Sequence, residues 1–489
     1  MRKFFAVALV LVLSVTALLG LAACNFEEDG ITITFYHTMG QGLRNVLEEY
    51  IAEFNKIYPD IHIEHTQVGD YDAVRNKVNV DISTGSEPNI AYCYPDHVAG
   101  YNIAKAVMEM DSYINSTGTV EAGKFGNSEE MPIGLTAAQI KDLQDGGFYE
   151  EGRQFAAKED GSTPMYTLPF SKSTEVLFYN KTFFEANKSK IDVPTHWWCN
   201  DSCPENCHSS MEYVCKTILE ITKDSGKDIV PLGYDSEANW FITMAEQFAT
   251  LDAEHKSLYT TAEGDAADHY LFNNDTMKEF MTRINGWYSK NYFTTKALNS
   301  DKYTSNLFKN QESFMSIGSS AGASNQAPQT VDGKYPFDVG ITIIPQVNPE
   351  APKVISQGPS VCIFNKASED EMLASWLFVK FLVTNTTFQA KFSQTSGYVP
   401  VLASVNNDPV YSAFLAAADG GDGITALSAK VCVEQAHAYY TSPAFNGSSK
   451  ARDEVGSLLV KCVAFSGNNI AAQIKTAFED AIKNCQKNK

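Results

Sequence analysis

Ile31-Thr32-Ile33-Thr34-Phe35-Tyr36 opens the folded part of the chain and alternates apolar with other side chains, as a strand does. A helical repeat of apolar residues follows from Leu43 to Phe54. We then expect a strand over 61–66, a helix from about Tyr71 to just before Gly85, and a strand over 89–94. This strand–helix–strand–helix–strand order predicts an open parallel α/β sheet, in which ligands bind at the carboxyl ends of the strands.

The rest of the chain continues to mix helices and strands. Residues 118–163 are polar and rich in Gly and Glu, and we interpret them as a crossing into a second lobe. Further elements are expected as strands over 168–180, 313–317 and 337–344, and as helices over 211–223, 240–250, 276–290, 368–382 and 469–483. The 489 residues exceed what one hydrophobic core usually serves, so two lobes are expected.

The N-terminus has the form of an export signal. Two basic residues precede an apolar stretch from Phe4 to Ala23, which closes on Leu21-Ala22-Ala23-Cys24. The cysteine after the expected cut resembles that of the lipobox in bacterial lipoproteins, where the thiol carries lipid and begins the mature chain. A retained membrane anchor is the alternative, since about 20 apolar residues can cross a bilayer. We expect a signal peptide over 1–23, a lipid-anchored linker over 24–30, and a location at the outer, extracytoplasmic face of the cell membrane.

Composition narrows the partners of the chain. It is 44% hydrophobic and 12% aromatic, as a globular protein is, and its formal net charge is −21. Because nucleic-acid binding depends on Lys and Arg that neutralise phosphates, the charge argues against a nucleic-acid partner. The sequence contains no P-loop and no H-E-x-x-H motif. We expect no cofactor.

Cysteine is concentrated in one insertion, residues 196–215. Four thiols lie there: Cys199, Cys203, Cys207 and Cys215. Their C-x3-C-x3-C-x7-C spacing differs from the C-x2-C knuckles of zinc sites, and outside the membrane disulfides are the usual state. We therefore expect local disulfides and no metal, with a metal site or free thiols as the alternatives. Cys462 and Cys485 form a further candidate pair across the last two helical segments.

One motif points towards an enzyme. Gly318-Ser319-Ser320-Ala321-Gly322 matches the G-x-S-x-G nucleophile elbow of serine hydrolases, and a strand precedes it. The segment after the serine does not have a helical pattern, and the one histidine downstream is His437. We expect a protein that is not an enzyme, with a secreted serine hydrolase using Ser320 as the remote alternative.

Several motifs together resemble a known family. The run Pro169-Phe170-Ser171-Lys172-Ser173-Thr174-Glu175-Val176-Leu177-Phe178-Tyr179-Asn180-Lys181 resembles the signature of family 1 extracellular solute-binding proteins of ABC importers. Matching pieces lie at 85–90, 314–317 and 395–400, in the family's order and spacing. The resemblance implies a two-lobed α/β fold of the periplasmic-binding-protein type, class II, with a hinge and a ligand cleft between the lobes. It also implies a monomer that delivers its solute to ABC permease subunits.

Each of the two expected lobes combines segments that are separate in the sequence. We expect residues 31–140 with about 313–350 to form the first lobe. We expect about 150–312 with 351–489 to form the second lobe, which carries the Cys-rich insertion.

Within the family, the motifs are most similar to the glycerol-3-phosphate-binding branch. Phe35-Tyr36-His37-Thr38-Met39 is similar to its first-strand F-W-H-S-M, and Pro194-Thr195-His196-Trp197 to its P-x-T-W, which makes Trp197 a candidate aromatic wall. Asp96 lies next to the position of an expected acidic contact, and Arg452 is the nearest candidate for a late arginine. Carried over by position, five residues would line the site: Tyr71, Ser173, Ser319, Gly358 and Tyr398.

The chemistry of these residues suits a polyhydroxylated ligand. Buried sugar hydroxyls need hydrogen-bond partners, which Ser173, Ser319 and Asp96 supply, while sugar C–H faces pack on aromatic rings. Such rings are offered by Tyr36, Tyr71, Tyr94, Trp240 and Tyr398. We expect a carbohydrate ligand. The alternative is sn-glycerol-3-phosphate or a glycerophosphodiester, whose phosphate would need a cation or backbone amides, with Lys172, His37 and Gly358 as candidates.

Overall fold

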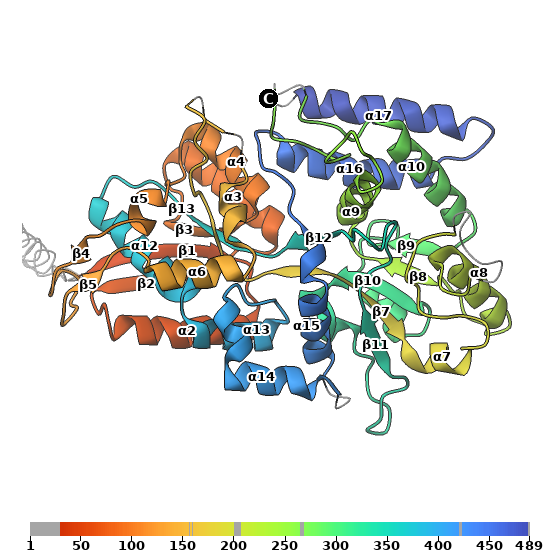
Figure 1. Cartoon of the computed structure of the whole chain (residues 1–489), viewed down its shortest axis with the longest axis horizontal. Coiled ribbons are helices and arrows are strands. Elements are labelled where there is room, and N and C mark those ends of the chain that lie inside the picture. Colours follow the sequence, from red (N-terminus) through yellow and green to blue (C-terminus); the bar gives the residue numbers. More distant parts are fainter. Residues whose placement is uncertain are drawn as a thin grey trace, which may run out of the picture.

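A computed structural model of the chain describes residues 30–155, 157–158, 160–199, 207–264, 268–419 and 423–487. Figure 1 shows two α/β lobes side by side. The predicted signal peptide with Cys24, and the predicted disulfide residue Cys203, lie outside the described residues. Among the helices that the structure describes, none combines the length and the apolar character needed to cross a membrane.

The first lobe is built on a five-stranded sheet with the order β2-β1-β3-β13-β6. Its strands are β1 (Ile31–His37), β2 (Ile61–Gln67), β3 (Ile90–Cys93), β6 (Leu168–Pro169) and β13 (Ser360–Ile363). The strands β1, β2 and β3 are mutually parallel, as the order of elements predicted, and β13 runs antiparallel to β3 and β6. The α/β fold class is confirmed.

Helices cover this first sheet. They are α2 (Gln41–Asn55), α3 (Tyr71–Thr84), α4 (Pro95–Tyr101), α5 (Asp111–Ile114), α6 (Ala137–Asp145), α12 (Glu369–Val383), α13 (Thr386–Ser396) and α14 (Pro409–Ala416). The α3 helix begins where the Asp70 carboxylate accepts a hydrogen bond from Ala73 N at 2.9 Å, and it ends at Gly85 with a φ of 68°. The cap therefore fixes Tyr71 at the first turn, beside the carboxyl ends of the strands.

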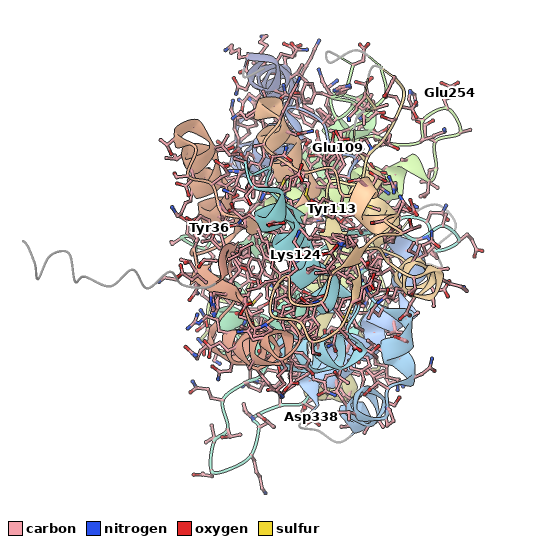
Figure 2. The ribbon with its side chains drawn as sticks, turned by 90° about the vertical axis from the view of Figure 1, so that its left-hand side faces the viewer. Tyr36, Glu109, Tyr113, Lys124, Glu254 and Asp338 are labelled. Atoms are coloured by element: carbon pink, nitrogen blue, oxygen red, sulfur yellow. The ribbon has the colours of Figure 1, made fainter. Side chains whose placement is uncertain are left out.

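Residues 105–165 belong to the first lobe, so the predicted crossing over 118–163 is wrong. Val120, Phe125 and Leu143 are buried in the same core as α12, and β4 (Thr119–Val120) pairs with β5 (Met131–Pro132). Figure 2 looks onto this end of the lobe, where Tyr113 and Lys124 are labelled. The segment is polar in composition, but its scattered apolar side chains are enough to anchor it on α12.

The second lobe is built on a seven-stranded sheet. The order β14-β12-β7-β10-β8-β9 forms its main path, and β11 also pairs with β7. Its strands are β7 (Ser173–Asn180), β8 (Leu232–Tyr234), β9 (Phe293–Thr295), β10 (Met315–Ser319), β11 (Val339–Thr342), β12 (Val354–Gln357) and β14 (Tyr439–Tyr440). The long strand β7 is buried along nearly its whole length and pairs with three others.

This topology corrects the predicted lobe boundaries. Residues 313–350, expected in the first lobe, supply β10 and β11 to the second sheet, because both strands pair antiparallel with β7. Residues 360–416, expected in the second lobe, return to the first, where β13 pairs with β3 and α12 and α13 pack in its core. The pairing partners are far apart in sequence, so hydrophobic pattern alone did not identify them.

Helices on the second lobe complete the described secondary structure. They are α7 (Lys181–Ala186), α8 (Met211–Thr222), α9 (Glu237–Ala249), α10 (Asp275–Tyr288), α11 (Ser305–Lys309), α15 (Ile424–Glu434), α16 (Ser448–Val463) and α17 (Ile470–Lys487). Short 3₁₀ turns lie in both lobes: η1 (Asn102–Ala104), η2 (Tyr149–Arg153), η3 (Ser320–Gln326), η4 (Ala403–Asn407), η5 (Ala417–Asp419) and η6 (Ala436–Ala438). No range was predicted for α4 to α7, for α11 or for α13 to α16.

Two segments cross between the lobes side by side. One joins β6 to β7 over residues 169–173, and the other joins β12 to β13 over residues 357–360. The backbone N–H groups of Phe170 and Ser171 both donate to Pro359 O, at 3.0 and 3.2 Å. Gly358 has a φ of 101°, and a Cβ added there would lie 2.6 Å from Ser171 O. The crossing chains are therefore packed closely enough to require glycine at this hinge.

The structure does not pair Cys462 with Cys485. Both are buried free thiols. The helices α16 and α17 follow one another through a short connection and pack together, as Figure 1 shows, with Cys462 near that connection. Cys485 lies 15 residues into α17, which places it roughly 22 Å along the helix axis from that connection. The predicted disulfide is wrong for this reason.

Candidate ligand-binding site

A cleft with a volume of about 940 Å³ opens between the two lobes. The first lobe contributes the start of α3 and the residues after β3. The second lobe contributes the start of α9, the ends of β7, β10 and β12, and one face of α16. Ligands were expected at the carboxyl ends of the parallel strands, after Tyr36 and Tyr94. Tyr94 and His97 of α4 line the cleft, whereas the described residues 37–40 do not.

Tyrosine side chains form one wall of the cleft. The rings of Tyr71 and Tyr94 stack with centroids 4.4 Å apart, and the ring of Tyr92 lies 6.5 Å behind Tyr71. The hydroxyl oxygens of Tyr71 and Tyr398 are 3.2 Å apart. Burial, followed by the charge of Tyr398, raises the pKa of both Tyr71 and Tyr94, so these phenols stay protonated as hydrogen-bond donors. The wall is a flat aromatic surface with polar tips.

A hydrogen-bonded polar cluster lies across the cleft on the second lobe. Asn239 Nδ2 donates to Glu175 Oε1 at 2.9 Å, while Asn239 Oδ1 accepts from Gln357 and Arg452. The second oxygen of Glu175 accepts from Tyr234. Burial raises the pKa of Glu175 to about 7, against the lowering effect of the Tyr234 and Asn239 hydrogen bonds. A carboxyl group whose pKa lies near neutrality therefore lines the cleft, with 1% of the residue exposed.

Charged side chains of both signs line the cleft. Six are carboxyl groups: Asp70, Asp72, Glu175, Asp235, Glu237 and Asp453. Four are cations: Arg75, Lys296, Lys309 and Arg452. Arg75 lies 3.4 Å from Asp72 and 3.6 Å from Asp453, which joins α3 to α16 across the cleft. The excess of acceptors suits a ligand rich in hydroxyl donors.

A small pocket of about 50 Å³ adjoins the cleft beside the hinge, and Asp96 and Gly358 line it. Lys172 also lines this pocket, but its ammonium group donates to Glu151 and to Ser360 Oγ, the latter at 3.1 Å. Asp96 Oδ2 accepts from Ser449 Oγ at 3.0 Å and so links α4 to α16. These residues hold the hinge region, and Lys172 already has an anionic partner.

Five predicted site residues lie at the cleft or the adjoining pocket, and Tyr398 contacts the wall. Tyr71, Tyr94 and Ser319 line the cleft, and Asp96 and Gly358 line the pocket. Ser173 is buried at the hinge and lines neither space. Tyr36 lies on the first lobe, with Lys77 Nζ 4.9 Å from its ring centroid; Figure 2 labels it.

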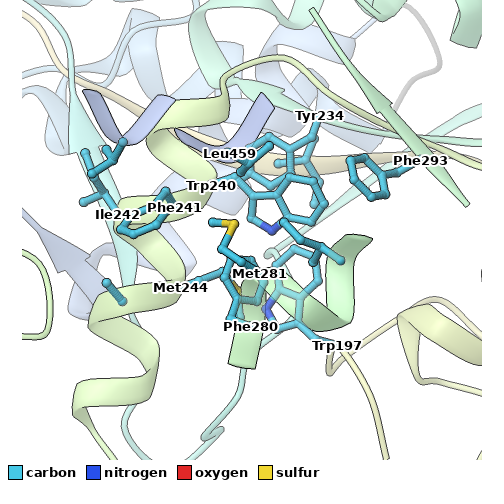
Figure 3. Close-up of a cluster of buried hydrophobic side chains, with 14 of the residues drawn as sticks. Trp197, Tyr234, Trp240, Phe241, Ile242, Met244, Phe280, Met281, Phe293 and Leu459 are labelled. Carbon is cyan, nitrogen blue, oxygen red and sulfur yellow. The ribbon is translucent and has the colours of Figure 1, made fainter. Parts of the chain in front are cut away.

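Trp197 and Trp240 are core residues, so their predicted role as aromatic walls is wrong. Their rings stack with centroids 6.0 Å apart inside the second lobe, and both are fully buried (Figure 3). Trp197 Nε1 donates to Gln247 Oε1 at 3.0 Å. An aromatic residue next to a predicted helix or turn has the same sequence signal whether it faces a core or a cleft, which is why the pattern could not separate the two.

His37 does not reach the cleft either. It is buried beneath the first sheet's helices, and its Nε2 lies 2.9 Å from His65 Nδ1. Burial, followed by the charge of His65, lowers the pKa of His37 to about 3. A neutral, enclosed imidazole cannot serve as the phosphate-binding cation.

Ser320 does not form a nucleophile elbow. It begins the 3₁₀ turn η3 and not an α-helix, and its buried Oγ accepts from Thr174 N at 3.3 Å. His437 is exposed, and its Nδ1 contacts Glu434 O at 3.1 Å. The hydrolase geometry that the motif requires is therefore not present at this serine.

Sequence reasoning missed most charged and polar residues of the cleft, among them Arg75, Glu175, Asp235 and Asn239. Glu175 could have been selected from the sequence, since it is the one acidic residue within an otherwise apolar strand. Arg452, named only as the nearest candidate for a late arginine, lines the cleft from α16. That helix also had a signal, because Ala451, Val455, Leu458 and Cys462 recur at helical spacing.

Among the described residues, the carboxyl groups and the histidine of this cleft do not bring three donor atoms close enough to share a metal ion. Within the described residues, one group of three or more His, Cys, Asp or Glu side chains has donor atoms close enough to share an ion, and it lies in the Cys-rich insertion. The cleft itself is built for hydrogen bonding and aromatic contact.

Comparison with known proteins agrees with this architecture. A sequence profile described as bacterial extracellular solute-binding protein matches residues 49–418. The sn-glycerol-3-phosphate-binding periplasmic protein UgpB of Escherichia coli strain K12 is 25% identical over 180 residues, 37% of this chain and 36% of that protein. The UgpB of Shigella dysenteriae matches to the same extent. The matched region thus spans about a third of the length of these relatives.

Solved structures share the fold at low sequence identity. UgpB from Mycobacterium tuberculosis in complex with glycerophosphocholine superposes with a TM-score of 0.66 at 17% identity, covering 93% of this chain and 98% of that one. A Listeria monocytogenes ABC substrate-binding protein in complex with cycloalternan has a TM-score of 0.65 at 16% identity, covering 94% and 99%. The maltodextrin-binding domain MalE of Bdellovibrio bacteriovorus, bound to maltotriose, superposes with a TM-score of 0.61 at 18% sequence identity. The match covers 94% of this chain and 99% of that one.

Proposed function

The chain belongs to the family of bacterial extracellular solute-binding proteins, and we propose that it binds a carbohydrate between its lobes and delivers it to the permease of an ABC importer. The main support for a carbohydrate ligand is that the cleft has an aromatic surface on one lobe and hydrogen-bond acceptors on the other. The Tyr71–Tyr94 stack on the first lobe faces acceptors such as Glu175 on the second. Aromatic faces pack on sugar C–H groups while carboxylates and amides accept from sugar hydroxyls.

The size of the cleft favours an oligosaccharide. Small-molecule sites in proteins range over about 300–1,000 Å³, and this cleft, at about 940 Å³, lies at the upper end. A ligand as small as glycerol phosphate would leave much of that space to water. The structural neighbours in complex with cycloalternan and maltotriose show that this fold holds oligosaccharides.

A second candidate ligand is glycerol-3-phosphate or a glycerophosphodiester. Arg452 favours it, because its guanidinium carbon lies 6.0 Å from the centroid of the Tyr94 ring, inside the cleft. Arginine is the side chain best suited to bind phosphate through two hydrogen bonds. The UgpB relatives have ligands of this class by name. The six carboxyl groups around the cleft weigh against an anion.

The hinge provides the delivery step. A ligand that contacts both lobes favours the closed arrangement, because those contacts are complete only when the lobes are together. The permease would then recognise the closed form. The two lobes of the chain supply both walls of the cleft, and we propose that the protein works as a monomer.

We also propose that lipid on Cys24 tethers the protein at the outer face of the membrane. The support is the sequence Leu21-Ala22-Ala23-Cys24 behind its apolar stretch. A tether keeps the binding protein close to its permease and so raises its effective concentration there. Radiolabelled palmitate should label the wild-type protein and not Cys24→Ser, and labelling of both would contradict the assignment.

Titration calorimetry with malto-oligosaccharides, cyclic oligosaccharides, glycerol-3-phosphate and glycerophosphocholine tests the ligand class. Binding of a sugar, retained in Arg452→Met but weakened in Tyr94→Ala, supports the carbohydrate. Binding of a glycerophosphate that is lost in Arg452→Met supports the second candidate. If no compound of either class produces heat or a shift in melting temperature, both assignments fail. Release of a cleaved sugar would contradict a binding function.

A further inference from the structure

We propose that His196, Cys199 and Cys207 form a zinc-binding site that clips together the two arms of the Cys-rich insertion, residues 196–199 and 207–215. The site is separate from the ligand cleft and was not expected from the cysteine spacing. Its evidence is the convergence of one imidazole and two thiols. His196 Nε2 lies 3.0 Å from Cys207 Sγ and 3.8 Å from Cys199 Sγ, and all three donor atoms lie within 4.8 Å of one another.

The 3.8 Å separation equals that of neighbouring ligands on a tetrahedral zinc ion, and the 3.0 Å separation is shorter than it. Zinc binds sulfur at about 2.3 Å and imidazole nitrogen at about 2.0–2.1 Å, so tetrahedral geometry places neighbouring ligand atoms roughly 3.5–3.8 Å apart. The donor set of two thiolates and one imidazole is one that zinc prefers over calcium or magnesium, which bind oxygen. Three protein ligands leave one tetrahedral position for a further donor, such as water.

The imidazole is already turned towards the thiols. Thr195 Oγ1 lies 3.1 Å from His196 Nδ1, which leaves Nε2 as the atom that faces Cys199 and Cys207. In metal sites, the second ring nitrogen of a ligating histidine usually contacts such a partner, which fixes the tautomer and the ring orientation. The contact therefore holds the histidine in an orientation that suits ligation.

Backbone hydrogen bonds join the two arms of the insertion next to the site. Thr195 N donates to Ser209 O at 3.0 Å, and Met211 N donates to His196 O at 2.9 Å. The next residue, Trp197, is buried in the core, as Figure 3 shows. Paired backbone and a buried tryptophan thus hold the two arms of the insertion in register, so the donors meet on a rigid base and not at a loop tip.

The cysteine pattern has a different meaning once the histidine is included. In His196-Trp197-Trp198-Cys199, two residues separate the histidine from the cysteine, the same spacing as in the C-x2-C motif of zinc sites. A search for cysteine pairs alone does not find this motif. Cys207 then supplies the second arm. Cys199 is exposed, and zinc would protect its thiol from the oxidation expected outside the membrane.

Metal content and spectroscopy test the site on the full chain, purified with its thiols reduced. We expect one equivalent of zinc by mass spectrometry of the metal, and cobalt substitution that gives the intense visible bands of a tetrahedral thiolate site. His196→Ala, Cys199→Ser and Cys207→Ser should each lose the metal and those bands. Matched controls are His208→Asn and Cys215→Ala, which change a histidine and a cysteine of the same segment outside the cluster and should keep one equivalent.

Two outcomes would overturn the proposal. One is a disulfide that includes Cys199 or Cys207, found by peptide mapping without reduction in protein prepared with zinc present. The other is reduced protein that binds no zinc or cobalt while it still binds its transport ligand. The Cys199→Ser variant changes an exposed side chain, so this protein should fold. It therefore tests the site even if the His196→Ala variant does not fold. If the variants lose zinc and still bind the transport ligand, the result supports the zinc site independently of which solute the cleft binds.

Discussion

Lys172 and Glu151 form a buried ion pair at the hinge, with 2% and 7% of their side chains exposed. Lys172 lies in the crossing segment between β6 and β7, and it also donates to Ser360 Oγ at the start of β13. Glu151 Oε1 accepts from Thr441 Oγ1 at 2.7 Å. This ion pair and its hydrogen bonds thus connect a crossing segment to both lobes, through Ser360 in the first and Thr441 in the second.

Removal of one partner should destabilise the whole protein. Lys172→Met leaves the Glu151 carboxylate buried without its cation, and breaking a buried pair in this way costs about 3–5 kcal/mol. Denaturant titration should show that loss in the free energy of unfolding. The double variant Lys172→Met/Glu151→Leu should recover much of it. As a control, Lys141→Met breaks an exposed pair with Asp145 and should cost less than about 1 kcal/mol.

Gly358 should tolerate no side chain, for a reason beyond its positive φ. In Gly358→Ala the new Cβ would lie 2.6 Å from Ser171 O and 2.7 Å from Lys172 Cα, both backbone atoms of the other crossing segment. The matched control is Gly467→Ala, at a φ of 94° with no atom within 4 Å, which should cost only the roughly 1–2 kcal/mol of left-handed backbone. Equal losses in unfolding free energy would show that the crossing is not tightly packed.

Local patterns predicted the local elements well. Residues 31–93 follow the expected strand and helix order because alternation and helical spacing record burial on one face. The placement of 313–350 failed because β10 and β11 find their partner, β7, more than a hundred residues earlier in the chain. Strand pairing at that distance leaves no trace in composition or period.

The candidate site divides in the same way. Tyr71 was predicted from the family resemblance, and Tyr94 from its aromatic ring at the end of a parallel strand, where the fold places ligands. Trp197 and Trp240 could not be distinguished from them, since a buried ring and a ligand-facing ring need the same residue type. Arg452 lies on α16, a helix whose apolar stripe was overlooked, and only the three-dimensional packing brings it beside Tyr94.

The aromatic wall should contribute to affinity through its ring face. Tyr94→Ala removes a ring that stacks on Tyr71 at 4.4 Å, and we expect about a tenfold weaker ligand affinity, equivalent to about 1.4 kcal/mol. Tyr94→Phe keeps the ring and should bind within a few-fold of wild type. Calorimetry gives both values. Tyr335→Ala, an exposed tyrosine outside the cleft lining, is the control, and an equal loss there would contradict a specific role for the wall.

Glu175 should make stability fall as pH rises towards neutrality. Burial raises its folded pKa to about 7 from the model-compound value of 4.5, so the folded protein binds more protons than the unfolded chain between these values. The free energy of unfolding therefore decreases across that window, by roughly 3 kcal/mol in total. Glu175→Gln should remove this part of the slope in denaturant titrations from pH 4.5 to 7.5.

Glu246 provides the matched control, because burial raises its pKa to about 7 as well, but it lies outside the cleft lining. Glu246→Gln should remove a similar part of the stability slope. Ligand affinity separates the two residues. We expect a ligand hydroxyl to donate to the ionised Glu175 carboxylate, so affinity should rise through pH 7 in wild type and in Glu246→Gln, and should stay flat in Glu175→Gln. Parallel pH profiles of affinity in all three proteins would show that Glu175 does not contact the ligand.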